Sequence, residues 1–561
     1  MSYYSNVNPE LFNVVPANAM RVLELGCGAG ALGRAFLGRN PKAKWIGVEL
    51  FPEAAEQARE CISEVVVGDC EAPAFFEQFK ENFDCIVAGD VLEHLRDPWS
   101  VLKTLRSLLT PNGTLCICVP NIGHISIVKG LLQGRFHYTD AGLLDRTHLR
   151  FFTRESLLEA LRGAEFSPEK LIPRRVLADE STSDVLLKAM KFGEPHSSAY
   201  QQAMSDLNAF QFVVRSVPKG SESLIQPKLV IAMLALAPSF ADVRTKDPLA
   251  LLGALPGVRT HYFERDFSIP NYPIELPKVV IVQRQLVMDI PGWRASLDRL
   301  HERGWAVIAE WDDHPDLFAP EIRAKFDKHP WASVLMADAV QVSTPSLAEH
   351  IEAIARREHR ELNLKVIENK VLSLGYAPRS ALVGRRLKVF LGALNRWADF
   401  RLLIEAIQSV KGLADRLEFT IISNDSQAQP IEGLNVLPPC SRQDYLKHLA
   451  ACDVCLCPLS DSEANRCKSP VKWLEASSMG VVTLASAVVY GEVIRHDEDG
   501  LLFHTPQGAA QLLEGLVADP SRITRLREAA TLRMKADFML VDDLQPRIDW
   551  YLQVAEKLSL R

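Results

Sequence analysis

Hydrophobic and polar positions follow the same pattern in three successive blocks of the chain. In each block, short apolar runs are separated by longer stretches whose apolar residues recur at helical spacing. This pattern is typical of parallel strands joined by crossover helices, because strands covered on both faces are apolar throughout. The chain is therefore predicted to be α/β, with three Rossmann-like domains in a row.

The limits of the three blocks predict the domain organisation. The first block begins near Arg21, with the expected strands "RVLEL", "KWIGVEL", "EVVVGD", "FDCIVAGD", "TLCICVP" and "FQFVVRSVP". The second begins at "PKLVIAMLALA" and the third at "RLKVFLGAL". A polar segment with two prolines (216–227) indicates a linker between the first and second blocks, and residues 375–386 indicate a hinge between the second and third. We expect domains at 1–218, 227–380 and 381–561, with the linker at 219–226.

The length and net charge of the chain argue mainly against certain partners and locations. A chain of 561 residues with a net charge of -7 and a pI near 6.1 gives no reason to propose nucleic acid or an anionic membrane as a partner. The N-terminus lacks the basic and apolar regions of a secretory signal, and the apolar run from Leu229 is too short to span a bilayer. We expect a cytoplasmic protein, either free or peripheral at the inner membrane face. The oligomeric state cannot be predicted.

The eleven cysteines mostly lie in strand-like runs, which suits a reducing compartment. Cys452, Cys455 and Cys457, with His448 nearby, are candidate zinc ligands. However, "DVCLCPL" alternates as a strand does, and no second cluster completes a set of four ligands. We therefore expect no metal.

The stretch "LELGCGAGALG" (Leu23 to Gly33) fits two cofactors. Read from Gly28 it is G-x-G-x-x-G followed by Glu49, the dinucleotide fingerprint. Read from Glu24 it is E-x-G-x-G-x-G (Glu24, Gly26, Gly28, Gly30), the loop of S-adenosylmethionine-dependent methyltransferases. Three details favour the second reading: Gly26 directly follows the strand, Glu24 can bind a cationic amino acid group, and Asp69 ends the third strand where adenine would lie.

Residues 1–218 resemble class I methyltransferases, specifically the branch found with surface-polysaccharide enzymes. The resemblance is carried by "DVLEHLRDP", "LLTPNGTLCICVPNIGH" and "GRFHYTDAGLLDRTHLRFFT". It implies S-adenosylmethionine as cofactor, with Glu49 and Leu50 near the ribose and Asp69 and Cys70 at the adenine. It also implies that the methionine end is lined by Asp90, Glu93 and His94.

Methyl transfer from a sulfonium needs a positioned acceptor and removal of its proton. "DAGLLDRTHLRFF" offers a polar cluster with aromatic neighbours, and His148 is our first choice for the general base, with His124 and His94 as competitors. The alternative is that Asp145, Arg146 and Arg150 only brace a loop by ion pairing.

The second and third blocks resemble glycosyltransferases of the two-lobed GT-B fold, through "NRCKSPVKWLEASSMGVVTLAS" and "YGEVIRHDEDGLLF". "CKSPVKWLEA" predicts a helix start with Ser469 as N-cap and Pro470 in the first position, which suits a diphosphate. Lys468 adds a charge beside it. The resemblance implies that Glu475 holds the nucleotide ribose, and that Lys472 and Arg396 contact phosphate. The C-terminal helix is expected to cross back to the first lobe.

One position departs from that resemblance. Retaining members often carry two glutamates eight positions apart here, and the first of these positions is Cys467. The donor sugar and the stereochemical course are therefore open. In the opposite lobe, "AEWDDHPD" places Asp312, Asp313 and His314 at a strand's carboxyl end, as candidates for acceptor contact or proton removal. Asp312 and Asp313 are equally compatible with capping the next helix.

The sequence thus predicts a bifunctional enzyme that uses S-adenosylmethionine and a nucleotide-sugar to modify a surface glycan or glycoconjugate. The catalytic candidates are His148, Asp313, Arg396 and Lys468. The acceptor is expected to be a lipid-linked or protein-linked glycan. Two alternatives keep the methyltransferase but make the C-terminal pair a non-catalytic glycan-binding module or a nucleotide-sugar epimerase.

Overall fold

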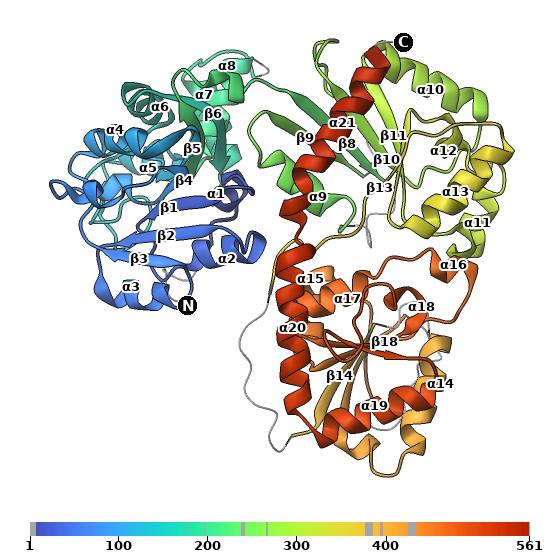
Figure 1. The fold of residues 1–561 in the computed structure, drawn as a ribbon. Helices are drawn as coiled ribbons and strands as arrows, with labels where there is room; N and C mark the ends of the chain where they lie inside the picture. Colours follow the sequence, from blue (N-terminus) through green and yellow to red (C-terminus); the bar gives the residue numbers. More distant parts are fainter. Residues whose placement is uncertain are drawn as a thin grey trace. The chain divides into compact units, whose positions relative to one another are not determined.

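The computed structural model describes residues 7–176, 178–195, 197–236, 242–264, 268–375, 385–392, 397–424 and 434–559 (Figure 1). The chain divides into two compact units, Met1–Pro227 with Gly253–Val258, and Lys228–Leu252 with Arg259–Arg561. The first unit holds one mixed sheet, and the second unit holds two sheets built mainly of parallel strands. The α/β prediction is therefore confirmed.

The first unit is built on a seven-stranded sheet in the order β3-β2-β1-β4-β5-β7-β6. The strands are β1 (Arg21–Leu25), β2 (Lys44–Glu49), β3 (Glu64–Val67), β4 (Phe83–Gly89), β5 (Leu109–Pro120), β6 (Phe166–Arg174) and β7 (Gln211–Pro218). β7 runs antiparallel to both of its neighbours. The chain moves outward from β1 to β3 and returns to β4 on the other side of β1. That reversal is where open α/β sheets bind ligands.

Helices cover this sheet and explain why its inner strands are apolar along their whole length. They include α2 (Ala31–Arg39), α3 (Pro52–Arg59), α4 (Pro98–Leu108), α5 (Ile125–Leu132), α6 (Arg154–Gly163), α7 (Glu180–Ala189) and α8 (Ser198–Leu207), besides the short α1 (Pro9–Val14). Two hydrophobic clusters result. One contains Leu23 and Ile86, and the other contains Val22 and Cys85, so alternate residues of β1 and β4 point into different clusters.

The second unit carries two six-stranded sheets (Figure 1). The N-lobe sheet has the order β13-β12-β11-β10-β8-β9 and the C-lobe sheet β16-β15-β14-β17-β18-β19. The N-lobe strands are β8 (Leu229–Ala235), β9 (Val258–Phe263), β10 (Lys278–Gln283), β11 (Trp305–Trp311), β12 (Ala339–Val342) and β13 (Leu364–Val366). The C-lobe strands are β14 (Leu387–Gly392), β15 (Leu417–Ile422), β16 (Leu434–Leu437), β17 (Val454–Cys457), β18 (Val482–Ser486) and β19 (Leu501–Phe503).

Several helices of the second unit begin after side chains that cap them. α10 (Ile290–Glu302) begins after Asp289, α13 (Pro345–Arg357) after Thr344 and α19 (Pro506–Ala518) after Thr505, and each cap accepts a backbone N–H of the first turn. In each case proline occupies an early helical position, where its missing N–H costs nothing. The remaining helices include α14 (Trp397–Ser409), α15 (Arg442–Ala450), α16 (Glu463–Arg466), α17 (Val471–Ser478) and α20 (Ser521–Asp537).

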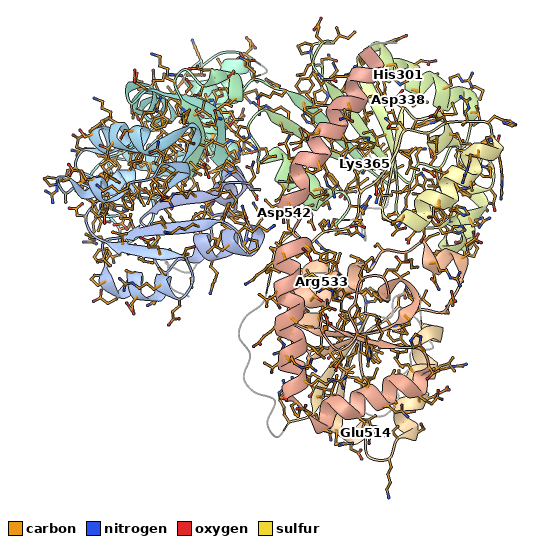
Figure 2. All side chains as sticks on the ribbon, viewed as in Figure 1. His301, Asp338, Lys365, Glu514, Arg533 and Asp542 are labelled. Carbon is orange, nitrogen blue, oxygen red and sulfur yellow. The ribbon has the colours of Figure 1, made fainter. Side chains whose placement is uncertain are left out.

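The last helix, α21 (Leu544–Ser559), leaves the C-lobe and packs on β10 and β11 of the N-lobe (Figure 1). The Tyr551 hydroxyl donates to Gln341 Oε1 at 3.1 Å. Lys365 of β13, labelled in Figure 2, donates to the Pro546 carbonyl at 3.1 Å and lies over the Trp550 ring. The helix thus crosses back as the sequence predicted.

The segment expected as a linker is shorter than predicted. Strand β7 continues to Pro218, and Ser216 and Val217 are fully buried in it. Beyond it, Lys219 donates its N–H to the Glu165 carbonyl, and Ser167 donates to Glu222 at 2.7 Å. The segment is therefore hydrogen-bonded to the first unit over part of its length, and most of the expected hinge lies outside the described residues. The exact domain boundaries stay predictions.

Two expectations about the chain as a whole can be compared with the structure. No helix among the described residues has the length and apolarity needed to cross a bilayer. Cys455 and Cys457 lie buried in β17 with their sulfurs 3.6 Å apart, and Cys452 donates to the His448 carbonyl. Within the described ranges, these cysteines do not form a group of three or more possible metal ligands.

Candidate active sites

The glycine-rich turn between β1 and α2 requires its glycines. Gly26, Gly28 and Gly30 have φ of 64°, 53° and 76°, a region that side chains disfavour. A Cβ atom on Gly26 would lie 2.6 Å from Val91 Cγ2. The turn therefore lets the backbone lie close to whatever binds above β1, at the point where the strand order reverses.

Acidic residues lie at the end of β2 and just after β3, on the same edge of the sheet. Both Glu49 oxygens accept backbone N–H groups, from Gly28 at 2.8 Å and Phe51 at 3.0 Å. Asp69 Oδ1 accepts from the Glu71 N–H at 2.8 Å. Because β1, β2 and β3 are adjacent and parallel, their carboxyl ends place the glycine turn, Glu49 and Asp69 along one edge.

The neighbours of these acids differ in exposure. Leu50 is 55% exposed, so it is available to lie against a ligand. Cys70 is half-buried, and burial, with the charges of Asp69 and Glu71, raises the pKa of its thiol to about 12. The thiol is therefore neutral at physiological pH and acts as a small apolar surface.

Glu24 has a different environment from the one the sequence predicted. Its carboxyl accepts the Trp45 indole N–H at 2.8 Å inside the sheet. Burial raises the pKa of Glu24 to about 8, so the group is largely uncharged at pH 7. An uncharged carboxyl lacks the attraction for a cation on which the prediction rested, and the role of Glu24 toward a ligand stays a prediction.

The other side of the reversal carries Asp90 and Glu93, just after β4. Asp90 has φ of 54° and accepts from Gln211 Nε2 at 2.5 Å. Burial raises the pKa of its carboxyl. Glu93 is 1% exposed, and neither of its carboxylate oxygens has a hydrogen-bond partner among the described residues. Burial and the neighbouring Asp90 raise the pKa of Glu93 well above its usual value.

His94 and His148 meet beside Glu93. Their rings lie 4.9 Å apart, edge to face. One carboxylate oxygen of Glu93 and one ring nitrogen of each histidine, atoms that could bind a metal ion, all lie within 4.8 Å of one another. His94 Nδ1 lies 3.2 Å from the Thr147 carbonyl and His148 Nδ1 lies 3.3 Å from the Leu143 carbonyl. Burial and the charge of His94 lower the pKa of His148, so its imidazole is neutral at pH 7.

The segment that carries His148 is attached to the Glu93 turn. The N–H groups of Leu149 and Arg150 both donate to the Glu93 carbonyl, at 2.7 and 2.9 Å. A row of aromatic rings extends from this point, with His148 6.4 Å from Phe151, Phe151 6.3 Å from Phe136, and Phe136 5.5 Å from Tyr138. These three aromatic side chains are between 36% and 52% exposed.

The loop that carries His148 is held by contacts that differ from the ion pairing of Asp145, Arg146 and Arg150 left open by the sequence. Asp145 accepts from Thr147 rather than from an arginine. Arg146 pairs with Asp140 at 2.8 Å, and Arg150 bonds the Arg96 carbonyl. The competitor His124 caps α5 by accepting the Ser126 N–H, which gives it a structural role.

In the second unit, the start of α17 differs by one residue from the prediction. Pro470 is the N-cap and Val471 the first helical residue. Ser469 therefore lies before the cap, where its hydroxyl accepts from Asn369 Nδ2 at 2.6 Å. The Lys468 N–H donates to the Asn465 carbonyl. The prediction of Ser469 as N-cap was wrong because the preceding turn continues to Lys468.

Lys472 and Glu475 share a face of α17, as their spacing predicts. Lys472 Nζ donates to the carbonyl of Gly392, at the end of β14. Glu475 lies 3.6 Å from Arg442, which also pairs with Asp247 of the N-lobe at 2.8 Å. Burial raises the pKa of Glu475, although Arg442 and Lys472 oppose that rise. Arg396 lies outside the described residues.

Asp312 and Asp313 follow β11 and are bridged by Arg284, which follows β10. Arg284 bonds Asp312 through Nε and Asp313 through Nη2, the latter at 2.8 Å. Burial alone would raise the pKa of Asp312, but the guanidinium outweighs it and the pKa is lowered. The alternative that these aspartates cap a helix was wrong, because the cap of the following turn is the His314 ring.

Cys467 is part of a hydrophobic cluster with Trp311 and Trp331 of the N-lobe. It is 3% exposed, and burial raises the pKa of its thiol to about 11. Its carbonyl accepts the Thr344 hydroxyl at 2.8 Å. The residue in place of the expected glutamate is thus a neutral packing group.

The structure also brings together residues that the sequence analysis missed. Arg284, Arg442 and Gln211 partner the expected acids, and His350 and Glu463 join His314 in a second group of possible metal ligands. No local motif marks any of these, because each contact joins segments far apart in sequence.

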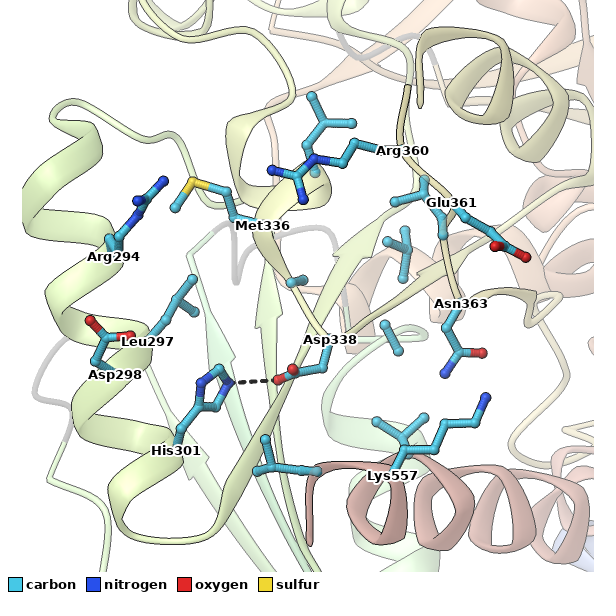
Figure 3. Close-up of a pocket in the computed structure, with 17 residues that line it drawn as sticks. Arg294, Leu297, Asp298, His301, Met336, Asp338, Arg360, Glu361, Asn363 and Lys557 are labelled. Atoms are coloured by element: carbon cyan, nitrogen blue, oxygen red, sulfur yellow. Dashed lines mark hydrogen bonds and ion pairs between the residues drawn. The ribbon is translucent and has the colours of Figure 1, made fainter. Parts of the chain in front are cut away.

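A cavity of about 720 Å³ lies at the N-lobe sheet's other edge, where β12 and β13 begin (Figure 3). His301, at the end of α10, lies 2.8 Å from Asp338, just before β12 (Figure 3). Asp338 also accepts the Val307 N–H at 2.8 Å. Because open α/β sheets bind substrates at the carboxyl ends of their strands, we assign no substrate to this cavity.

The glycine turn and the candidate acids thus lie at the carboxyl ends of strands in three α/β sheets. Residues 6–171 match the family described as "Methyltransferase domain", and residues 385–519 match "Glycosyl transferases group 1". The chain is therefore a methyltransferase domain fused to a group 1 glycosyltransferase. The family match over residues 6–171 supports the methyltransferase reading of the glycine turn over the dinucleotide reading.

Relatives with curated names match the first unit. Over 180 residues the chain is 29% identical to the ubiquinone biosynthesis O-methyltransferase of Xanthomonas campestris pv. campestris (strain B100), covering 29% of this chain and 74% of the relative. It is also 29% identical, over 151 residues, to the malonyl-[acyl-carrier protein] O-methyltransferase of Geobacter sulfurreducens, covering 26% and 55% of the two chains.

Solved structures resemble each half more weakly. TarM has a TM-score of 0.37 at 15% identity, covering 49% of this chain and 54% of its own. The plantazolicin methyltransferase BamL has a TM-score of 0.27 at 14% identity, covering 37% and 83%. The assignment therefore rests on the family matches.

Proposed function

We propose that the first unit transfers a methyl group from S-adenosylmethionine to a sugar hydroxyl, and that the second adds a sugar from a nucleotide-sugar to a glycan or glycoconjugate. The observation that carries the methyl-transfer half is the group of Glu93, His94 and His148 beside the glycine turn. The named relatives are O-methyltransferases, which supports oxygen as the accepting atom.

The residues of the first unit fit the proposed cofactor. Gly26, Gly28 and Gly30 give the turn at the carboxyl end of β1 three positions without side chains, where the cofactor would lie against the backbone. Glu49 lies beside it as an acceptor for ribose hydroxyls, and Asp69 and Cys70 follow at the adenine position. Asp90 and His94 line the methionine end. The cofactor supplies a methyl group already activated on positively charged sulfur.

The acceptor's place follows from the aromatic row. Phe151, Phe136 and Tyr138 present partly exposed ring faces and edges next to His148. Aromatic faces pack against the apolar C–H faces of sugar rings by dispersion and burial. We assign activation of the acceptor hydroxyl to the neutral imidazole of His148 within its cluster.

In the second unit we assign the nucleotide-sugar to the start of α17. Lys468, Ser469, Lys472 and Arg396 provide positive charge and hydrogen bonds for the diphosphate. Glu475 is assigned to the ribose, in exchange for its present contact with Arg442. Asp313 is assigned to the acceptor hydroxyl. Lys468 and Arg396 stabilise the leaving diphosphate as its charge develops.

We place this activity in surface-glycan assembly in the cytoplasm, including the inner membrane face, with a lipid-linked or protein-linked acceptor. The test is nucleotide release from a panel of sugar nucleotides, with and without glycan acceptor, followed by methyl incorporation from labelled cofactor. Acceptor-dependent nucleotide release supports the proposal. Conversion of the donor without acceptor indicates an epimerase, and sugar binding with no turnover indicates a binding module.

A further inference from the structure

We propose that Glu93, His94 and His148 form a binding site for one divalent transition-metal ion such as Zn²⁺. This ion holds the acceptor oxygen during methyl transfer. The inference rests on the proposed function and deepens it. It concerns how His148 acts on the hydroxyl, namely through the ion.

The first observation is the convergence of three suitable donors. One carboxylate and two imidazoles have ligand atoms within 4.8 Å of one another. A single ion bound at about 2.0–2.2 Å from each donor needs them roughly 3–3.5 Å apart, which modest side-chain rotations achieve. Two imidazoles favour a transition metal over Mg²⁺ or Ca²⁺, which prefer oxygen ligands.

The second observation is the state of Glu93. Its side chain is buried to 99%, and no described residue donates a hydrogen bond to either carboxylate oxygen. Buried carboxylates are ordinarily paired, hydrogen-bonded or bound to a metal. Because the Glu93 carboxylate has no protein partner in the described ranges, a cation between it and the two histidines supplies the positive charge that stabilises it.

The third observation concerns the histidine ring nitrogens. Nδ1 of His94 and Nδ1 of His148 each lie within hydrogen-bond distance of a backbone carbonyl, which accepts only from a protonated nitrogen. This places the proton on Nδ1 and leaves the lone pair on Nε2. Histidines that bind metals are held in this way, by a second hydrogen bond that sets the tautomer.

In the other possible metal-binding group, His314, His350 and Glu463, the ring proton of His314 lies on the opposite nitrogen. His314 Nδ1 accepts the Asp316 N–H, so its proton must lie on Nε2, which then cannot bind a metal. The acid of that group, Glu463, has a side chain that is 79% exposed and already lies 3.3 Å from His350. This group is therefore the natural control.

One carboxylate and two histidines leave coordination positions open for oxygen ligands. An acceptor hydroxyl bound there is acidified and loses its proton to water. The oxygen then forms a bond to the methyl carbon while the carbon–sulfur bond breaks, and its electron pair stays on sulfur. The products are a methyl ether and the neutral thioether form of the cofactor, so charge and atoms balance.

The test uses the full chain, stripped of metal by chelation and titrated with Co²⁺, whose visible absorption reports its ligands. We expect one Co²⁺ per chain, at least about tenfold weaker binding in Glu93→Gln and in His148→Asn, and unchanged binding in His350→Gln. A thermal unfolding midpoint equal to that of the parent chain shows that each variant is folded. Equal Co²⁺ binding by the parent and both site variants, no binding by the parent, or loss only in His350→Gln overturns the proposal.

Methyl transfer by the stripped and Zn²⁺-loaded chains separates this inference from the proposed function. Zn²⁺-dependent methyl transfer supports both. Full transfer by the stripped chain overturns the metal role and leaves the methyltransferase assignment standing. Co²⁺ binding as expected, with no methylated sugar in any metal state, overturns the proposed acceptor and leaves the metal site standing.

Discussion

The two units differ in how the charges at their strand ends are compensated. In the second unit Arg284 bridges Asp312 and Asp313, and Arg442 joins Glu475 to an aspartate of the other lobe. Each acid there already has a cationic partner. A ligand that uses these groups must replace an existing ion pair.

The first unit leaves groups unused. Glu93 is buried without a partner among the described residues, and the hydrogen bonds of His94 and His148 occupy only one ring nitrogen each. A ligand can bind there without breaking an ion pair. The candidate site of the first unit thus offers a buried acid without a partner among the described residues, whereas that of the second unit offers acids already held in ion pairs.

The largest expected effect is on methyl transfer. His148→Ala should lower kcat/KM for methyl transfer by about 10²–10⁴-fold, the range for loss of a group that activates the acceptor. S-adenosylmethionine affinity, measured by calorimetry, should be unchanged. His137→Ala, an exposed histidine of the same loop, is the matched control. Equal losses in the two variants would remove the distinction between His148 and its loop.

The next effect concerns the exchange of contacts in the second unit. Lys468→Ala and Glu475→Ala should each lower acceptor-dependent nucleotide release by about 10²–10³-fold, because diphosphate and ribose contacts are lost. Arg442 keeps its pairing with Asp247 in the second variant, so the fold should persist. Lys447→Ala, at an exposed lysine of α15, serves as control. Transfer at the parent rate in both variants would mean that the donor binds elsewhere.

A smaller effect is expected at Asp69. Loss of a charge-assisted hydrogen bond to the ligand costs roughly 1.5–3 kcal/mol, so Asp69→Ala should weaken S-adenosylmethionine binding at least about tenfold. Asp69→Asn can still accept the Glu71 N–H and keep the turn, which separates ligand contact from local folding. Calorimetry on both variants decides, and unchanged affinity in both would remove the adenine assignment.

The smallest effect is a shift along the pH axis. Burial and the charge of His94 lower the pKa of His148, with Asp145 opposing. The neutral imidazole therefore persists to lower pH than in a free histidine, and is lost as the pH falls through the lowered value. Methyl transfer should fall on acidification with a midpoint below the ordinary histidine value of about 6.5. A pH–rate profile with its acid limb centred above that value would contradict the assignment.

Much of the fold could be predicted because strand runs and glycine turns are local signals. β1 to β5 and the positive φ angles of Gly26, Gly28 and Gly30 follow from short stretches of sequence. The start of α17 was predicted within one residue, because Ser-Pro is a helix-start signal but does not settle which residue is the cap.

The charge partners could not be predicted in the same way. Arg284 meets Asp312 across neighbouring strands, and Arg442 meets Glu475 across two helices. The missing partner of Glu93 is a property of its whole surroundings. Pairing and isolation of charges depend on tertiary packing, which no spacing along the chain encodes.

The position of α21 has a consequence for how the protein is made. Trp550, Tyr551 and Val554 are buried in a helix that packs on β10 and β11, strands that leave the ribosome more than two hundred residues earlier. Until α21 emerges, that face of the N-lobe sheet stays uncovered while the C-lobe strands are synthesised. Exposed apolar sheet surface in nascent chains favours aggregation. The two lobes can therefore complete their folding only once α21 has been synthesised, whereas the methyltransferase unit can finish long before.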